Sequence, residues 1–186
     1  CSGTCVDDLM PLLRRRKSDR TLISETYLAV VRRQIAYGEE NGIPWGVSES
    51  AYNARYLQFN YQYAPFGVPG LGLKRGLADD LVIAPYATAL ALPLAAKAGI
   101  ATLRRLADEG MFDRHGFFEA VDYTKDRLPP GQTSALLDAY MPHHQGMILV
   151  ALAPLLRDNI MPRRFPRNPQ SDPAGPPHHE PIPVSI

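Results

Sequence analysis

The 186-residue sequence has little cysteine and almost no excess charge. Its two cysteines, Cys1 and Cys5, lie so close together that a disulfide between them would close only a very short loop. The fold therefore does not depend on disulfides, which suits a reducing compartment. Twenty basic and 19 acidic side chains leave a formal charge of +1, so no global field favours nucleic acid, anionic membrane or a polyanionic substrate. A partner must be recognised by a local site.

A long hydrophobic run is also missing. The longest uncharged stretch, residues 81–96, contains Pro85 and Pro93 and is shorter than the roughly 20 apolar residues of a membrane-spanning helix. We interpret it as a buried helix of a soluble domain. No signal peptide is visible, and the start at cysteine rather than methionine indicates a piece of a longer protein. With 45% hydrophobic and 21% charged residues, the chain suffices for one domain with a core.

Apolar residues recur at helical spacing over much of the chain. No series of strands of the βαβ or sandwich kind is present, and residues 116–123 are a short strand or the edge of a loop. Asp79 and Asp80 are expected at a helix N-terminus, with Pro85 in its first turn. The spacing predicts helices over residues 21–37 with Gly38 as cap, 79–98, 97–109 with Gly110 at the end, and 134–158 interrupted at Pro142 and Pro154.

Residues 41–76 combine glycine and proline with many Tyr, Phe and Trp side chains. Neither a strand period nor a helix period persists there, so the segment is predicted to be a long ordered loop. Loops of this length are uncommon in compact domains and are usually functional, which makes this segment the first place to expect a site.

The two ends of the chain differ from its middle. Residues 1–20 are basic beside an apolar patch, which indicates a solvated helix end more than a phosphate or lipid site. Residues 161–186 are rich in proline and poor in aliphatic side chains, so they are predicted to be a disordered tail. The remaining residues, 21–160, form the predicted domain.

Two carboxylates lie among aromatic residues and are the main functional candidates. Glu49 follows Trp45 in WGVSES, and Glu119 lies between Phe118 and Tyr123 in GFFEAVDY. Cleaving or transferring a glycosyl group needs two carboxyl groups across the scissile bond, and sugars stack on aromatic rings. The alternative is that both glutamates are partly exposed loop residues that make local caps.

A charged group follows the aromatic segment and contains Lys74, Arg75, Asp79 and Asp80. The stretch GLGLKRG lacks both the P-loop spacing and the dinucleotide-binding fingerprint, so phosphate binding is not predicted. Salt bridges that fix a loop are the simpler interpretation, and in a carbohydrate site the same groups would bind hydroxyls.

The adjacent residues His143 and His144 could contact sugar hydroxyls. They lack the i, i+4 spacing of HExxH, and no cysteine cluster completes a ligand set, so no metal site is expected. A hydrogen-bonded histidine at the edge of the core is the alternative for His144. Ser48 and Ser50 do not form a G-x-S-x-G elbow, so a serine hydrolase is not predicted.

Four motifs occur in order: IPWGVSESAYN, YQYAPFGVPGLGLKRGLADDLVIAPYATALAL, GFFEAVDYT and HHQGM. Together they resemble the glycoamylase-like region of cyclic β-1,2-glucan synthases over about residues 21–160. Those synthases are large inner-membrane proteins that join a glycosyltransferase domain, this glycoside-hydrolase-like domain and a phosphorylase-like domain. The resemblance implies a mainly α fold, part of an (α/α)6 toroid with long aromatic- and glycine-rich loops forming a sugar cleft at one end.

The resemblance also implies an activity, which is cleavage or transfer of β-1,2-glucan chains by cyclisation or hydrolysis. It places the catalytic carboxylates at Glu49 and Glu119, with their individual roles open. No metal or cofactor is expected. The implied partners are β-1,2-glucan and the remainder of a synthase polypeptide, with this soluble segment on the cytoplasmic side of a bacterial inner membrane. The implied sugar-binding residues are Trp45, Tyr61, Tyr63, Phe66, Lys74, Arg75, Asp80, Tyr123, His143 and His144.

The sequence departs from a complete toroid. Such a fold needs about twelve helices of roughly 11 to 12 residues, and this chain supplies only about half of them. Pro142 and Pro154 would each cost about 3 kcal/mol in a helix interior. Two alternatives to an active domain therefore stay open: a domain that binds β-glucan without turnover, and an inactive remnant whose exposed helices associate.

Overall fold

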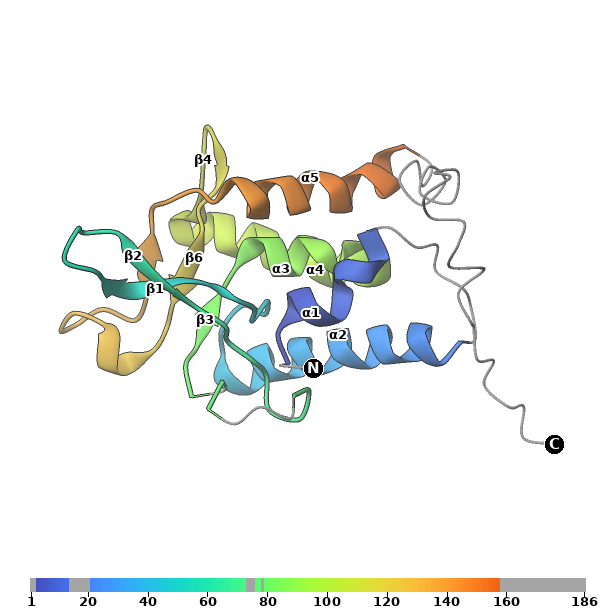
Figure 1. Cartoon of the computed structure of the whole chain (residues 1–186), viewed down its shortest axis with the longest axis horizontal. Coiled ribbons are helices and arrows are strands. Elements are labelled where there is room, and N and C mark those ends of the chain that lie inside the picture. Colours follow the sequence, from blue (N-terminus) through green and yellow to red (C-terminus); the bar gives the residue numbers. More distant parts are fainter. Residues whose placement is uncertain (1–2, 14–20, 73–75, 78, 158–186) are drawn as a thin grey trace.

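A computed structural model describes residues 3–13, 21–72, 76–77 and 79–157. Lys74, Arg75 and the predicted tail 161–186 lie outside the described residues. About half of this part is helical, and the rest includes small antiparallel sheets (Figure 1). Its helices are α1 (Cys5–Leu9), α2 (Leu22–Asn41), α3 (Pro85–Leu90), α4 (Leu92–Leu106) and α5 (Pro142–Leu156), with short helical turns η1 (Met10–Leu13), η2 (Ala107–Met111) and η3 (Lys125–Arg127).

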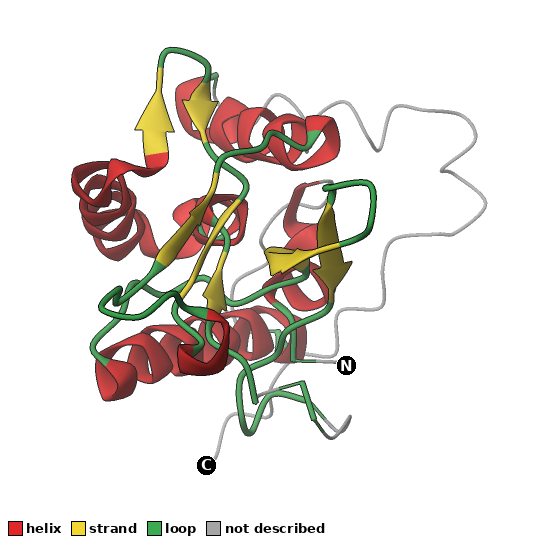
Figure 2. Ribbon diagram, turned by 90° about the vertical axis from the view of Figure 1, so that its left-hand side faces the viewer, coloured by secondary structure: helices red, strands yellow, loops and turns green. Residues whose placement is uncertain are grey.

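The strands gather at one end of the helices (Figure 1). Figure 2, which looks at the molecule from that end, shows the strands in front of helices seen roughly along their axes. The sheets have the strand orders β1-β2, β3-β6-β7 and β4-β5. The strands are β1 (Ser50–Arg55), β2 (Tyr61–Ala64), β3 (Val82–Ile83), β4 (Phe112–Asp113), β5 (Gly116–Phe117), β6 (Ala120–Asp122) and β7 (Ala135–Leu137).

The short helix α3 is the centre of the core. Every residue from 82 to 92 is buried, and α3 packs against α1, α4 and α5. The prediction that the uncharged run of residues 81–96 is buried is therefore confirmed for residues 82–92, whereas residues 93–96 are partly or fully exposed. The run is divided among β3, α3 and the start of α4 instead of forming one helix.

The predicted helix start at Asp79 is wrong. Pro85 is the first residue of α3, where its fixed φ and missing N–H are tolerated. The preceding Val82 and Ile83 pair with β6 as strand β3. Asp80 lies outside the helix and forms an ion pair with Arg127. The predicted boundary between two helices near residue 97 corresponds to a kink within α4, where Ala95 has the non-helical backbone angles φ −140° and ψ 54°. Beyond the kink the helix runs to Leu106 and continues into η2.

Helix α2 begins where predicted but ends later. Thr21 caps its N-terminus in a reciprocal pair of hydrogen bonds with Ser24. Its C-cap is Gly42 in the left-handed conformation and not Gly38. Gly38 lies inside the helix, where a Cβ would come within 2.9 Å of the Trp45 Cβ and 3.0 Å of the Ile43 carbonyl oxygen.

Gly38→Ala is therefore expected to destabilise the fold by about 1–2 kcal/mol, because overpacking against Trp45 and backbone outweighs the gain in helix propensity. Gly146→Ala is the matched control, since a Cβ at this glycine of α5 meets nothing within 4 Å. The control is expected to raise stability by up to about 1 kcal/mol. Urea unfolding of both variants checks this, and equal effects would contradict the packing argument.

Helix α5 begins at Pro142, so the predicted interruption there is wrong. A proline at the first helical position loses no intrahelical hydrogen bond. The residues before it form β7 and a loop instead of helix. Pro154 does lie inside the helix, in its last turn.

The predicted long loop over residues 41–76 contains the hairpin β1-β2. A register irregularity between Tyr52 and Arg55 interrupts the alternation of side chains, which hides the strand period from the sequence. Near the N-terminus, α1 and η1 pack Cys5, Leu9 and Leu13 into the core beside α3. The domain boundaries at residues 20 and 160 stay predictions. Within the described residues, no helix is both long and apolar enough to cross a bilayer.

Candidate functional site

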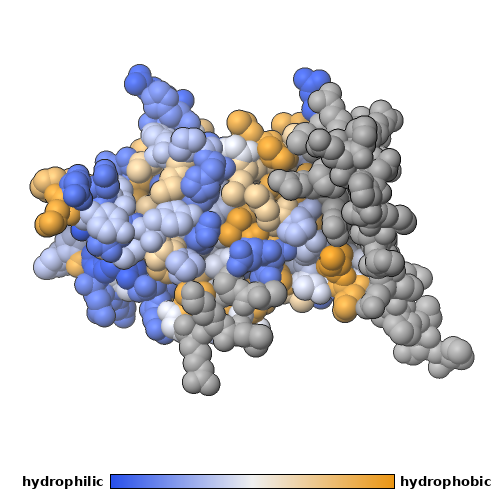
Figure 3. Space-filling model, viewed as in Figure 1, coloured by the Kyte–Doolittle hydropathy of each residue, from blue (hydrophilic) through white to orange (hydrophobic). Residues whose placement is uncertain are grey.

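The strand end of the molecule is also its more hydrophilic part in the view of Figure 3. Several chemistry-bearing side chains meet there, at the N-termini of α3 and α5. Glu119 directly precedes β6, His144 lies in the first turn of α5, and Tyr63 comes from β2. Tyr86 belongs to the first turn of α3.

Glu119 is a buried carboxylate with only 2% of the residue exposed. Its Oε1 accepts a hydrogen bond from the Ala51 N–H at 3.2 Å. Its Oε2 lies 2.9 Å from Nδ1 of His144. Each carboxylate oxygen therefore has one nitrogen within hydrogen-bonding distance.

His144 connects Glu119 to the rest of the site. It is 1% exposed, and its ring stacks on Tyr86 with centroids 3.7 Å apart. While Nδ1 faces Glu119, Nε2 lies 3.3 Å from the Tyr63 hydroxyl. A neutral imidazole with its proton on Nδ1 donates to Glu119 and accepts from Tyr63. The histidine therefore fits both of its neighbours without a charge change.

Tyr63 links this pair to Glu49. Burial raises the pKa of the Tyr63 hydroxyl, and the negative charge of Glu49 raises that pKa further. The hydroxyl therefore stays protonated at neutral pH. Tyr63, His144 and Glu119 are joined through the His144 ring nitrogens, and Glu49 acts on Tyr63 through its charge. We call these four residues the carboxylate network.

Tyr86 fixes the backbone next to Glu49. Its hydroxyl lies 2.9 Å from Ser48 Oγ and 2.8 Å from the Glu49 carbonyl oxygen. The Val6 N–H donates to the same Ser48 Oγ at 3.1 Å, so α1 helps to support this turn. Tyr86 therefore holds both ends of the network, through its ring under His144 and its hydroxyl at Glu49.

His143 is the exposed neighbour of the network. Its ring centroid lies 4.0 Å from that of His144 and 6.4 Å from that of Tyr63. Burial and the adjacent His144 lower the pKa of His143, while Glu119 and Glu49 act in the opposite direction. His143 is thus neutral at pH 7 and available at the surface beside both glutamates.

The structure therefore brings together five predicted site residues: Glu49, Tyr63, Glu119, His143 and His144. The alternative interpretation, a hydrogen-bonded histidine at the edge of the core, also describes His144. Its ring is buried, and both ring nitrogens lie within hydrogen-bonding distance of a neighbouring side chain. Among the described residues, no group of three or more His, Cys, Asp or Glu side chains could hold a metal ion.

The other predicted sugar-binding residues have different surroundings. Trp45 and Phe66 are 5% and 2% exposed and pack in the core, so packing accounts for them and sugar contact stays a prediction. The Tyr61 ring is covered by the Arg55 guanidinium at 4.5 Å, and its hydroxyl donates to Asp138. The Tyr123 hydroxyl donates to Glu109.

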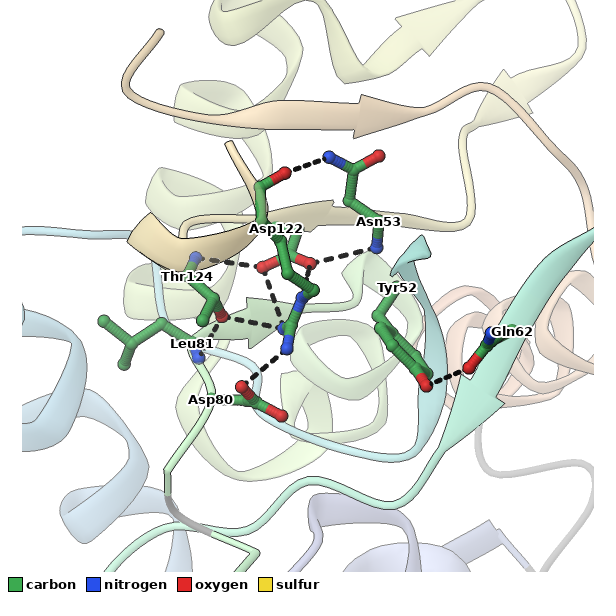
Figure 4. Close-up of polar contacts among 8 residues, drawn as sticks. Tyr52, Asn53, Gln62, Asp80, Leu81, Asp122 and Thr124 are labelled. Carbon is green, nitrogen blue, oxygen red and sulfur yellow. Dashed lines mark hydrogen bonds and ion pairs between the residues drawn. The ribbon is translucent and has the colours of Figure 1, made fainter. Parts of the chain in front are cut away.

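Asp80 belongs to a second polar cluster (Figure 4). Its Oδ1 accepts from Arg127 at 2.6 Å, and Arg127 also pairs with the buried Asp122 at 2.7 Å. Sequence spacing alone does not indicate Asp122, Arg127 or Tyr86. For Asp122 the signal in the sequence is its position at the end of a buried strand, three residues after Glu119.

Comparison with known proteins gives three findings. Residues 12–169 match the Glycoamylase family, described as "Putative glucoamylase". The chain is 44% identical over 152 residues to the cyclic beta-(1,2)-glucan synthase NdvB of Rhizobium meliloti (strain 1021), covering 82% of this chain and 5% of that protein. Its fold is similar to that of an endo-beta-1,2-glucanase from Chitinophaga pinensis in complex with sophorotriose and glucose. The TM-score is 0.58, with 16% identity over 91% of this chain and 39% of the other.

Proposed function

We propose, because this chain belongs to the Glycoamylase family, that it forms a carbohydrate-active enzyme domain that cleaves or transfers β-1,2-glucan chains. The chain spans 5% of the synthase and 39% of the glucanase, so the remainder of a larger synthase polypeptide is proposed as its partner. The membrane side on which it works stays a prediction of the resemblance.

One observation carries the proposal: Glu49 and Glu119 belong to a single network at the strand end of the helices. Glycosidases and transglycosylases use two carboxyl groups, one as proton donor and one as nucleophile or base. Glu49 and Glu119 are proposed as these two groups, and neither is assigned an individual role.

The arrangement of the helices supports the finer proposal of a partial (α/α)6 toroid. Helix α3 packs among α1, α4 and α5, and the strands and loops lie together at one end (Figure 1). In such a fold the loops at one end form the cleft. The carboxylate network lies at that end in this chain.

Binding without turnover is the second candidate function, and the burial of Glu119 favours it. The Glu119 side chain is fully covered in the structure. A sugar reaches the Glu119 carboxylate only if the side chains that cover it move. A domain in which they do not move would hold glucan at Glu49 without cleaving it.

The proposal is tested by titrating the chain with linear β-1,2-gluco-oligosaccharides, with β-1,4-linked oligosaccharides of equal length as control. We expect the amide resonances of Ala51 and the ring resonances of His143 to shift only with the β-1,2 linkage, because the sugar would bind beside them. No shift with either sugar, or equal shifts with both, would overturn the assignment of this site to β-1,2-glucan.

A further inference from the structure

Strand β1 has an unusual second edge. One edge pairs with β2, with Ala51 opposite Tyr63. N–H groups two residues apart in an extended strand point the same way. Here the Ala51 N–H donates to Glu119 Oε1 at 3.2 Å, and the Asn53 N–H donates to Asp122 Oδ2 at 2.9 Å. Glu119 and Asp122 lie at the two ends of the β6 segment, so β1 docks on that segment through two side-chain carboxylates.

Asp122 is itself held from several directions, as Figure 4 shows. Its residue is fully buried. Arg127 donates to both of its oxygens, at 2.7 Å from Nε and 3.1 Å from a terminal nitrogen. The Thr124 N–H donates to Oδ1 at 2.9 Å. The Asn53 side chain closes the cluster by donating to the Arg127 carbonyl oxygen at 2.6 Å.

Arg127 also joins this cluster to the loop before β3. It donates to Asp80 Oδ1 at 2.6 Å, and its guanidinium lies 4.9 Å from the centre of the Tyr52 ring. Two carboxylates therefore share one cation. The charge of the buried Asp122 is compensated by a bidentate pair, the strongest geometry that Arg offers.

We propose that Asp122, held by Arg127, is a positioning residue for Glu119. It fixes the outer edge of β1 so that the Ala51 N–H meets the Glu119 carboxylate, and so it sets the geometry of the Glu119–His144 pair. The catalytic meaning of this role rests on the proposed function, but the geometric role does not. Asp122 acts through β1 and is not assigned any contact with sugar.

The test is NMR of the full chain with labelled histidine and backbone. In the unmodified chain the His144 Nδ1 proton is expected as a downfield signal that exchanges slowly, because it is buried and bonded to Glu119. In Asp122→Ala its exchange is expected to be about tenfold faster. The loss of one buried hydrogen bond would make the locally opened state, from which the proton exchanges, about tenfold more populated. The Ala51 amide is expected to shift as well.

Two further variants keep the test decisive. Asp122→Asn keeps the shape of the side chain but loses the charge pair with Arg127, so it is expected to shift the Ala51 amide in the same direction and by less. Asp80→Asn is the control, because it removes the charge of the outer partner of Arg127 and leaves both β1 bonds in place. Its Ala51 and His144 signals are expected to match those of the unmodified chain.

The proposal is overturned if a folded Asp122→Ala or Asp122→Asn chain keeps the Ala51 and His144 signals of the unmodified protein, because loss of stability alone does not move native-state resonances. Equal changes in Asp80→Asn would also overturn it. Turnover of glucan by the same variants is a separate readout. Signal changes without any glucan activity would leave the positioning role standing and count against the proposed function alone.

Discussion

His144→Ala is expected to destabilise the chain by about 3–5 kcal/mol, the cost of removing one partner of a buried ion pair or its hydrogen-bonded equivalent. The Glu119 side chain is fully covered, and without His144 its only remaining donor is the Ala51 N–H among the contacts of the described residues. The ring of Tyr86 would also lose its stacking partner. Urea unfolding followed by circular dichroism measures the effect.

His143→Ala is the matched control for this prediction. The two histidines are adjacent on α5, but His143 is exposed and contacts the rings of His144 and Tyr63 from the surface. Its replacement is expected to change stability by no more than about 0.5 kcal/mol. The double variant Glu119→Gln with His144→Ala should cost less than the sum of the single variants, because it leaves no unpaired charge. Equal costs for the two histidines would contradict the buried-pair account.

Glu119→Gln and Glu49→Gln are each expected to lower the turnover of linear β-1,2-glucan by about 10²–10⁴-fold, the usual contribution of a positioned acid or base. Glutamine keeps the size and one acceptor oxygen of glutamate, so glucan binding is expected to persist. Turnover is measured from reducing ends and binding by titration calorimetry.

Glu40→Gln serves as the control for the glutamine variants. Glu40 lies on α2 and pairs with the Arg33 side chain at the surface. Its replacement is expected to leave turnover unchanged. If Glu119→Gln loses binding together with turnover, the carboxylate is structural, and the domain is better described as a glucan-binding one.

The sequence was sufficient to find the residues of the network but not the bonds that join them. Glu119 bonds to Ala51, 68 positions earlier, and to His144, 25 positions later. Spacing rules describe neighbours within one helix or strand, so such contacts are outside their reach. Asp122 was missed for the same reason, because its importance comes from Arg127 and from the edge of β1.

Helix ends show a second limit of sequence reasoning. Gly38 and Gly42 are both suitable caps, and the packing of Trp45 against Gly38 decides that the helix continues to the second glycine. Pro142 was predicted as an interruption although a proline is equally suited to a helix start. Here Pro142 starts a helix because residues shortly before it form β7, which pairs with β6 and so cannot belong to a helix.

The most direct test of the central claim is product analysis after incubating the chain with linear β-1,2-glucan, alongside Glu49→Gln and Glu119→Gln. The account predicts shorter or cyclic products from the unmodified chain and their loss in both variants, with glucan binding retained. Unchanged glucan from a folded, unmodified chain, or products that persist in either variant, would contradict a catalytic site built on these two carboxylates.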